Sequence, residues 1–308
     1  MKKQKLKKSA AAATIALAVS MGSAVNVSAA TAATLPGSPS TPESKESLET
    51  KRNQLAERQQ KAPIEALEAI AGTQNALIAL QNNDTGKAMA VLQDVSGKLD
   101  VLLAKYPGLT LIPANIEADV DDFDGDPKEV DKIVDEADRL LRDHKVQDAR
   151  SILSDLVSEM RITTTSIPLG TFPAAIKDAV KLIDQGKKDE AEDALYDVLN
   201  LLVKTVEIIP LPVLKAEALV TAASELEHKS DLTQEASRSE ILKLTDAAKE
   251  KLKLAEILGY GDKADYKQLY EAIDGIKDVI HSEKSAAFWD KIKNSLSTLK
   301  NKIMHPGK

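Results

Sequence analysis

The stretch Ile183-Asp184-Gln185-Gly186-Lys187-Lys188-Asp189-Glu190-Ala191 contains the pattern that decides the fold. Ile183 belongs to one apolar helical run, Gly186 follows three residues later, and Ala191 begins the apolar face of the next run. Glycine adopts the left-handed backbone conformation that closes a helix without a steric penalty. The stretch therefore predicts a tight turn between two helices.

Two further segments, starting at Leu80 and Leu141, align with the segment from Ile183 over twenty residues without gaps. Each segment has an alanine eight residues after its start, and apolar residues then follow at steps of four, three and four. This spacing traces one face of a helix, and the alanine indicates a close crossing between neighbouring helices. The sequence thus predicts three helical hairpins, with Ala88, Ala149 and Ala191 as structural contacts. The apolar residues after them are Leu92, Val95 and Leu99, then Leu153, Leu156 and Met160, then Leu195, Val198 and Leu202.

The turn position gives an independent check on the repeat. Asn83, His144 and Gly186 all lie three residues after the starting apolar residue. Their residue types tolerate a positive φ, so we expect a left-handed residue at each of the three turns.

Each repeat unit ends in a short motif that contains proline. The second and third units end in Ile-Pro-Leu, at 167–169 and 209–211, and the first ends in Leu111-Ile112-Pro113. We expect these prolines to stop each second helix and turn the chain. Three irregular units are few for an open solenoid, which favours a compact bundle.

The fold class we expect is all-α: a helical bundle of pseudo-repeated helical hairpins with an additional C-terminal helical module. Residues 43–223 form the expected hairpin domain, with helix starts near Pro42 and Pro63. Residues 224–308 form the module, with helices near 234–258, 264–281 and 285–303.

The N-terminus predicts export. Five lysines in the first eight residues precede a short run of apolar and small residues, and Val27-Ser28-Ala29 offers a cleavage pattern. Residues 1–30 therefore read as a signal peptide cleaved near Ala29 or Ala30, and 31–42 as a flexible leader. An uncleaved membrane anchor is the alternative. We expect the mature protein in the periplasm.

Composition excludes several classes of partner and site. The formal charge is −7, and losing the signal lysines makes it more negative, which argues against a nucleic-acid partner. There is no cysteine, so the chain has neither disulfides nor thiolate metal sites. No nucleophile elbow, glycine-rich phosphate loop or paired histidine motif is present, and we expect no catalytic residues and no cofactor.

The pattern over residues 69–223 resembles the YfdX family of bacterial exported proteins. The resemblance lies in Ala76-Leu77-Ile78-Ala79-Leu80 with Gly86-Lys87-Ala88, in Ile167-Pro168-Leu169 with Ala174-Ala175-Ile176, and in 184–191. It implies an all-helical, oligomeric protein associated with bacterial stress responses, and no established enzyme class. The last third of the chain is not covered by it.

An acidic stretch is the strongest candidate for a metal site. Asp121, Asp122, Asp124 and Asp126 surround Gly125 and make weak calcium candidates, but their register does not fit an EF-hand loop. The alternative is structural: Asp126 caps a helix that has Pro127 at its first position. We favour the structural interpretation.

The last helix carries a candidate membrane face of Phe288, Trp289, Ile292, Leu296 and Leu299, with lysines beyond it. Basic amphipathic helices can lie on anionic membranes. The alternative, which we favour, is packing of this stripe within the C-terminal module.

The sequence thus favours a non-enzymatic, stress-associated binding or passive chaperone-like protein. Its expected partners are further copies of itself, together with unfolded clients or small apolar ligands. A structural or membrane-surface protein acting through the last helix is the alternative.

Overall fold

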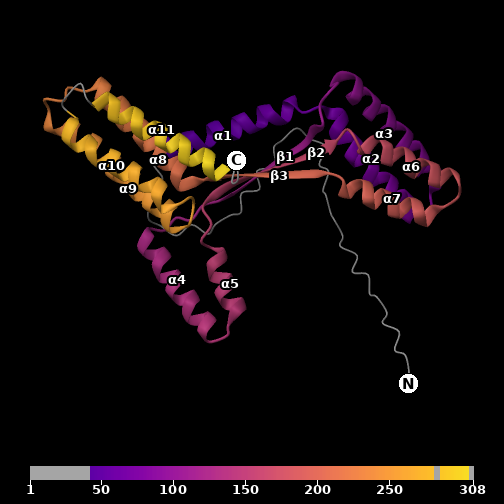
Figure 1. Cartoon of the computed structure of the whole chain (residues 1–308), viewed down its shortest axis with the longest axis horizontal. Coiled ribbons are helices and arrows are strands. Elements are labelled where there is room, and N and C mark those ends of the chain that lie inside the picture. The colour runs from indigo at the N-terminus through magenta and orange to yellow at the C-terminus, as the bar shows by residue number, and fades with distance from the viewer. Residues whose placement is uncertain (1–41, 281–284, 305–308) are drawn as a thin grey trace.

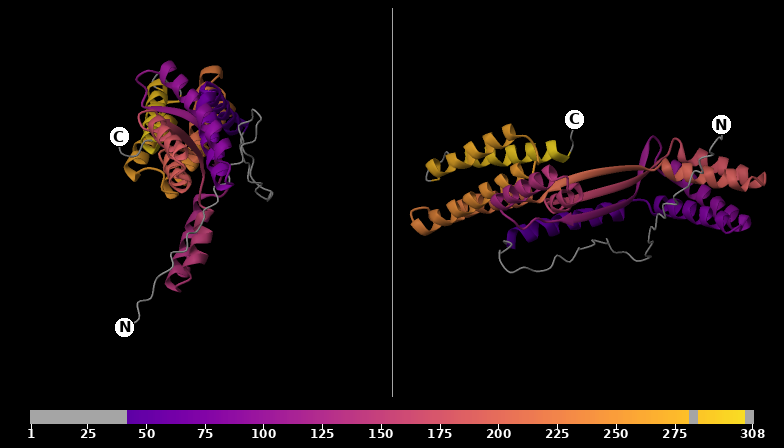
Figure 2. Two further views of the ribbon diagram at one scale, coloured as in Figure 1. Left: turned by 90° about the vertical axis from the view of Figure 1, so that its right-hand side faces the viewer. Right: turned by 90° about the horizontal axis from the view of Figure 1, so that it is seen from below.

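The computed structural model describes residues 42–280 and 285–304, in which eleven helices and three strands are found. The molecule is elongated, with a helical bundle at each end and a three-stranded sheet between them (Figures 1 and 2). The predominantly helical class is confirmed, whereas the sheet was not predicted. The predicted signal peptide and nearly all of the predicted leader lie outside the described residues.

One bundle consists of two of the predicted hairpins. Helices α2 (Ile64–Gln81) and α3 (Thr85–Lys105) form the first, and α6 (Phe172–Asp184) and α7 (Lys188–Asn200) form the other. They pack so that α2 contacts α7 and α3 contacts α6. Both hairpins bury their repeated apolar positions in one shared core.

The three turns have the predicted backbone conformation. Asn83, His144 and Gly186 have φ values of 59°, 60° and 71°. Each turn also contains the same backbone hydrogen bond, in which the N–H of the residue after the turn residue donates to a carbonyl five residues earlier, at 2.8–2.9 Å. The three units therefore share a backbone structure at the turn as well as a sequence pattern.

The middle hairpin departs from the prediction of one compact bundle. Helices α4 (Pro127–Arg142) and α5 (Val146–Ser154) project away from both bundles (Figure 1). Ala137, Leu140 and Ala149 form a small core between them. Helix α5 ends at Ser154, so Leu156 and Met160 do not extend its apolar face as predicted.

The sheet is made from the segments that follow each hairpin. Strands β1 (Leu111–Asp121), β2 (Glu159–Pro168) and β3 (Val203–Pro210) pair antiparallel in the order β1-β2-β3. The prolines predicted to stop helices lie instead in strands. Pro113 is in the outer strand β1 beside a register shift, and the other two prolines end β2 and β3. Proline removes a ladder donor, which such positions tolerate.

Helix α1 (Pro42–Lys61) lies along the sheet and covers one of its faces (Figure 2). Leu55 of α1 is buried with Ile116, Met160 and Ile162 of the strands and with Leu214. The opposite face carries polar side chains such as those of Glu117 and Thr163. The sheet is therefore a two-sided element with one apolar, covered face.

The second bundle consists of α8 (Leu211–Lys229), α9 (Glu235–Ile257), α10 (Lys263–Val279) and α11 (Ser285–Met304). The last three helices follow the predicted ranges closely. The domain boundary expected at residue 224 falls inside α8, because the core of this bundle begins at Val213. Among the described residues, no helix is both long and apolar enough to cross a membrane.

Candidate functional site

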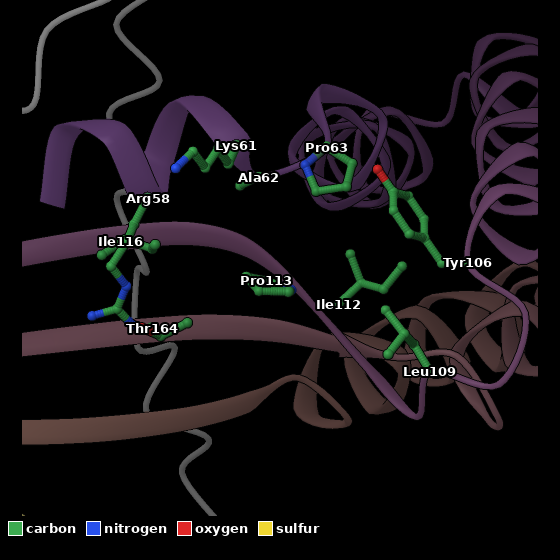
Figure 3. A pocket seen from close by; sticks show the side chains of 10 residues that line it. All are labelled: Arg58, Lys61, Ala62, Pro63, Tyr106, Leu109, Ile112, Pro113, Ile116 and Thr164. Carbon is green, nitrogen blue, oxygen red and sulfur yellow. The ribbon is translucent and has the colours of Figure 1, made fainter. Parts of the chain in front are cut away.

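A groove of about 300 Å³ opens where α1 meets the first bundle and the sheet (Figure 3). It lies between the end of α1, the start of α2, the loop after α3 and strands β1 and β2. Most of its exposed lining is apolar. The lining residues are Arg58, Lys61, Ala62, Pro63, Tyr106, Leu109, Ile112, Pro113, Ile116 and Thr164.

Local sequence signals explain the shape of the groove. Pro63 has an extended conformation and separates α1 from α2, which leaves a step between the two helices. After α3, Gly108 has a φ of 88°, and this turn brings Leu109 to the groove beside Tyr106. Gln59 fixes α1 to the sheet, since its Oε1 accepts a hydrogen bond from the N–H of Ile116 at 2.7 Å.

Two cations lie on one side of this apolar surface. Figure 3 shows Arg58 and Lys61 on the α1 side, with the Tyr106 ring on the other side. Arg58 Nη1 lies 3.4 Å from Glu207 Oε2, and the two side chains are 46% and 29% exposed. An exposed pair of this kind stabilises by about 0–1 kcal/mol, so an anion in the groove can compete for Arg58. The arrangement suits a small apolar molecule that carries a negative group.

None of the groove residues was predicted as a site. They come from three separate parts of the chain, at 58–63, 106–116 and 164, and only the fold brings these parts together. The sequence does contain one signal, which is the alternation of apolar residues at 112, 114, 116 and 118 that is typical of a strand with one covered face.

The acidic stretch is divided between structural roles. Both carboxylate oxygens of Asp122 accept from Lys215 Nζ at 2.8 Å, and Oδ1 also accepts from Ser158 Oγ. Asp126 caps α4 in a capping box with Glu129, which confirms the structural interpretation of that segment. Within 42–280 and 285–304, no group of three or more potential ligand side chains is placed to hold a metal ion. Asp121, Asp122, Asp124 and Asp126 are therefore not assembled into a calcium site.

A polar network joins the sheet to the second bundle. The hydroxyl of Tyr260 accepts from the N–H of Ser158 and donates to Glu159 Oε2. Lys215 and Lys251 lie near Asp122 on the other side of Ser158. Desolvation, followed by the charge of Lys215, lowers the pKa of Lys251. The network contains ion pairs and a tyrosine but no arrangement of nucleophile and base.

The three repeat alanines lie in the interiors of their hairpins. Ala88, Ala149 and Ala191 are all buried, the first and last in the shared bundle core and Ala149 in the small core of the middle hairpin. Each is therefore placed where a larger side chain would meet the neighbouring helix.

The candidate membrane face does not face outward. Trp289, Ile292, Leu296 and Leu299 are buried in the core of the second bundle, and Phe288 packs against the same core. The indole N–H of Trp289 donates to buried Glu227. Lys300 and Lys302 form ion pairs with acids of the same bundle. The stripe is thus an internal packing surface, because α8 and α10 offer it apolar partners.

The two histidines that the structure describes lie in different helical elements. His144 forms the turn between α4 and α5, and the Nδ1 atom of His228 lies 2.6 Å from the carbonyl oxygen of Ser224 within α8. His281 and His305 lie outside the described residues.

Fold and groove together define a protein of repeated helical hairpins on an antiparallel sheet, with an apolar groove beside the sheet. Residues 69–208 match the family described as YfdX protein, which is the family that the sequence pattern resembles. The match extends from α2 to β3 and leaves the second bundle outside it.

Solved structures that are similar to part of the chain include one from the YfdX group. It is the YfdX protein of Salmonella Typhi, with 15% sequence identity and a TM-score of 0.34. The alignment covers 49% of this chain and 93% of that chain. No curated protein matches this chain.

Proposed function

We propose that the protein is an exported, non-enzymatic binding protein that holds small apolar acids, or apolar side chains of unfolded clients, in the groove beside Tyr106. The observation that carries this proposal is the groove itself, where an apolar lining is combined with Arg58 and Lys61 on one side. Leu109 adds an apolar side chain that is 52% exposed at the same place. Exposed leucine is common on protein surfaces, but Leu109 forms part of the lining of the groove.

The physical basis of binding is burial of apolar surface. A ligand chain that covers Leu109 and Tyr106 gains about 25 cal/mol for each Å² of apolar surface removed from water. The cations add a charge-assisted contact to a carboxylate, which gives the site a preference for acids over alcohols of equal length. A volume near 300 Å³ lies at the lower end of small-molecule sites, so a short chain is the fitting size.

The cellular setting of this proposal is the periplasm under stress. The N-terminal pattern of lysines and apolar residues supports export. The match of residues 69–208 to the YfdX family supports the association with stress. Since the periplasm has no ATP supply, the protein is proposed to hold clients passively and not to drive their folding.

Titration calorimetry with octanoate, using octanol as an uncharged match, tests ligand binding. We expect octanoate to bind more tightly, and Arg58→Ala to weaken octanoate without changing octanol. Arg52→Ala, an exposed arginine elsewhere on α1, is the matched control. Absence of heat with both compounds would overturn the proposed ligand class.

A second pair of variants tests the apolar lining. Leu109→Ser should weaken both compounds, whereas Leu103→Ser should not, because Leu103 is similarly exposed but does not line the groove. The same pair tests the holding role through the aggregation of heat-unfolded malate dehydrogenase. Equal suppression by wild type and Leu109→Ser would show that clients bind elsewhere.

A further inference from the structure

The projecting hairpin α4–α5 has an apolar face that no other described part of the chain covers. Figure 1 and the left view of Figure 2 show the hairpin projecting from the molecule, with its turn at the free end, and α4 also contacts α9 of the second bundle. Its sister hairpins α2–α3 and α6–α7 are packed on each other. The three hairpins align residue by residue, so the exposure of equivalent positions can be compared directly.

The comparison identifies positions that are buried in both sisters and exposed here. Leu141 is 45% exposed, whereas its counterparts Leu80 and Ile183 are 0% and 8% exposed. Leu153 and Val134 are 39% and 41% exposed. The counterparts of Leu153 are Leu92 and Leu195, and both are fully buried. The counterparts of Val134 are Thr73 and Ile176, which are fully buried as well.

The sister hairpins also show what covers such a face. In the first bundle the first helix of one hairpin packs on the second helix of the other, α2 on α7 and α3 on α6. Leu80, Leu92, Ile183 and Leu195 belong to the single core that results. The element that fits this repeat face is therefore another hairpin of the same repeat.

We propose that the α4–α5 hairpin pairs with the α4–α5 hairpin of a second copy of this chain, forming a four-helix bundle between two molecules. Helix α4 of one copy packs on α5 of the other, as α2 packs on α7 within the chain. A two-fold axis relates the two hairpins, so one patch serves both copies. This inference is independent of the groove and of any ligand.

Charge permits this pairing. Residues 127–154 contain six basic and seven acidic side chains, a formal charge of −1, although the whole chain carries −7. Two copies that meet through this hairpin therefore bring together surfaces of mixed sign. Like-charge repulsion between the negatively charged chains is therefore weak at this surface.

The contact is small, because α4 has 16 residues and α5 only 9. Interfaces below about 1,200 Å² belong to weak and transient complexes. The dimer is therefore expected to dissociate on dilution, and its concentration dependence is measurable by sedimentation velocity.

The test compares the full-length mature protein with two variants. We expect Leu141→Ser combined with Leu153→Ser to raise the dimer dissociation constant by about 100-fold, since each dimer loses four apolar contacts. Val146→Ser is the matched control: Val146 is 55% exposed on the same hairpin, but its counterpart Thr85 is exposed too. Circular dichroism shows whether the variants keep their helices.

A second measurement needs no substitution. Hydrogen exchange of wild-type protein should become slower in residues 134–153 as concentration rises, with no such change in α2, α3, α6 or α7. Wild type that is monomeric at all concentrations, a dimer that survives the double substitution, or protection at another surface would each overturn the proposal. Slow hydrogen exchange of the hairpin at all concentrations would also overturn the proposal, because it would show that another segment of the same chain covers the apolar face.

Discussion

The hydroxyl of Tyr260 donates a hydrogen bond to Glu159 Oε2 at 3.0 Å and so ties the second bundle to the first residue of β2. Glu159 is almost fully buried, and Arg161 holds its other oxygen at 2.6 Å. Tyr260 also accepts from the N–H of Ser158 at 3.1 Å. Tyr260, which lies outside the region matched by the family, thus provides hydrogen-bond partners for two buried residues inside that region.

Tyr260→Phe should lower the free energy of unfolding by about 1–3 kcal/mol, because Ser158 and Glu159 each lose a buried partner. Tyr196→Phe is the control, since its hydroxyl is exposed and contacts only Gln81. That change should stay within about 0.5 kcal/mol. Urea unfolding measures both. Equal effects would mean that the junction contributes little to stability.

Alkaline pH should destabilise the second bundle. Desolvation by burial is the main cause that raises the pKa of Tyr260, Tyr266 and Tyr270 above the ordinary value. The folded state therefore resists losing these protons, while the unfolded chain loses them near pH 10. Their contribution is fully present below about pH 10 and is lost as pH rises above it. Urea unfolding at stepped alkaline pH checks this, and a flat stability profile would contradict it.

Ala191→Phe should destabilise the first bundle by about 1–3 kcal/mol or prevent its formation, since a large ring has no space in a packed core. The matched control is Ala174→Phe, because Ala174 lies exposed on α6 in the same bundle. Thermal unfolding of both variants is the measurement. Unchanged unfolding of Ala191→Phe would mean that the repeat alanine is not a close contact.

The turn positions should respond oppositely to two substitutions. Gly186→Ala should cost about 1 kcal/mol through backbone conformation alone, because nothing lies within 4 Å of a Cβ added there. His144→Gly should leave stability unchanged or raise it, since His144 already has a φ of 60°. Chemical denaturation of both proteins provides the comparison.

The intact mature protein should not co-sediment with anionic phosphatidylglycerol vesicles through α11, because the apolar stripe of that helix is buried. Deleting residues 285–308 should expose the remaining core and increase the binding of an apolar fluorescent dye. Lipid binding by the intact protein that disappears on this deletion would instead show that α11 leaves the bundle at a membrane.

The groove and the sheet could not be predicted from local sequence patterns. The segments Glu159–Pro168 and Val203–Pro210 are rich in β-branched residues, a signal for strands. Each of these segments also ends in isoleucine and proline, a pair that is equally typical of the end of a helix. Neither strand has a partner within its own neighbourhood: Ile112 pairs with Ile167, and Met160 pairs with Ile209. Strand pairing between residues so far apart in the sequence leaves no local periodicity from which the pairing could be predicted.

The local repeat can be predicted from the amino-acid pattern alone: three hairpins, left-handed turns at Asn83, His144 and Gly186, and buried alanines eight residues after each start. Those features follow from 3.6-residue periodicity and from backbone conformation, which act between near neighbours. Long-range packing determines that two hairpins bury each other while α4–α5 stands apart. The three sequences carry the same apolar face, and which faces meet depends on where the strands between them place each hairpin.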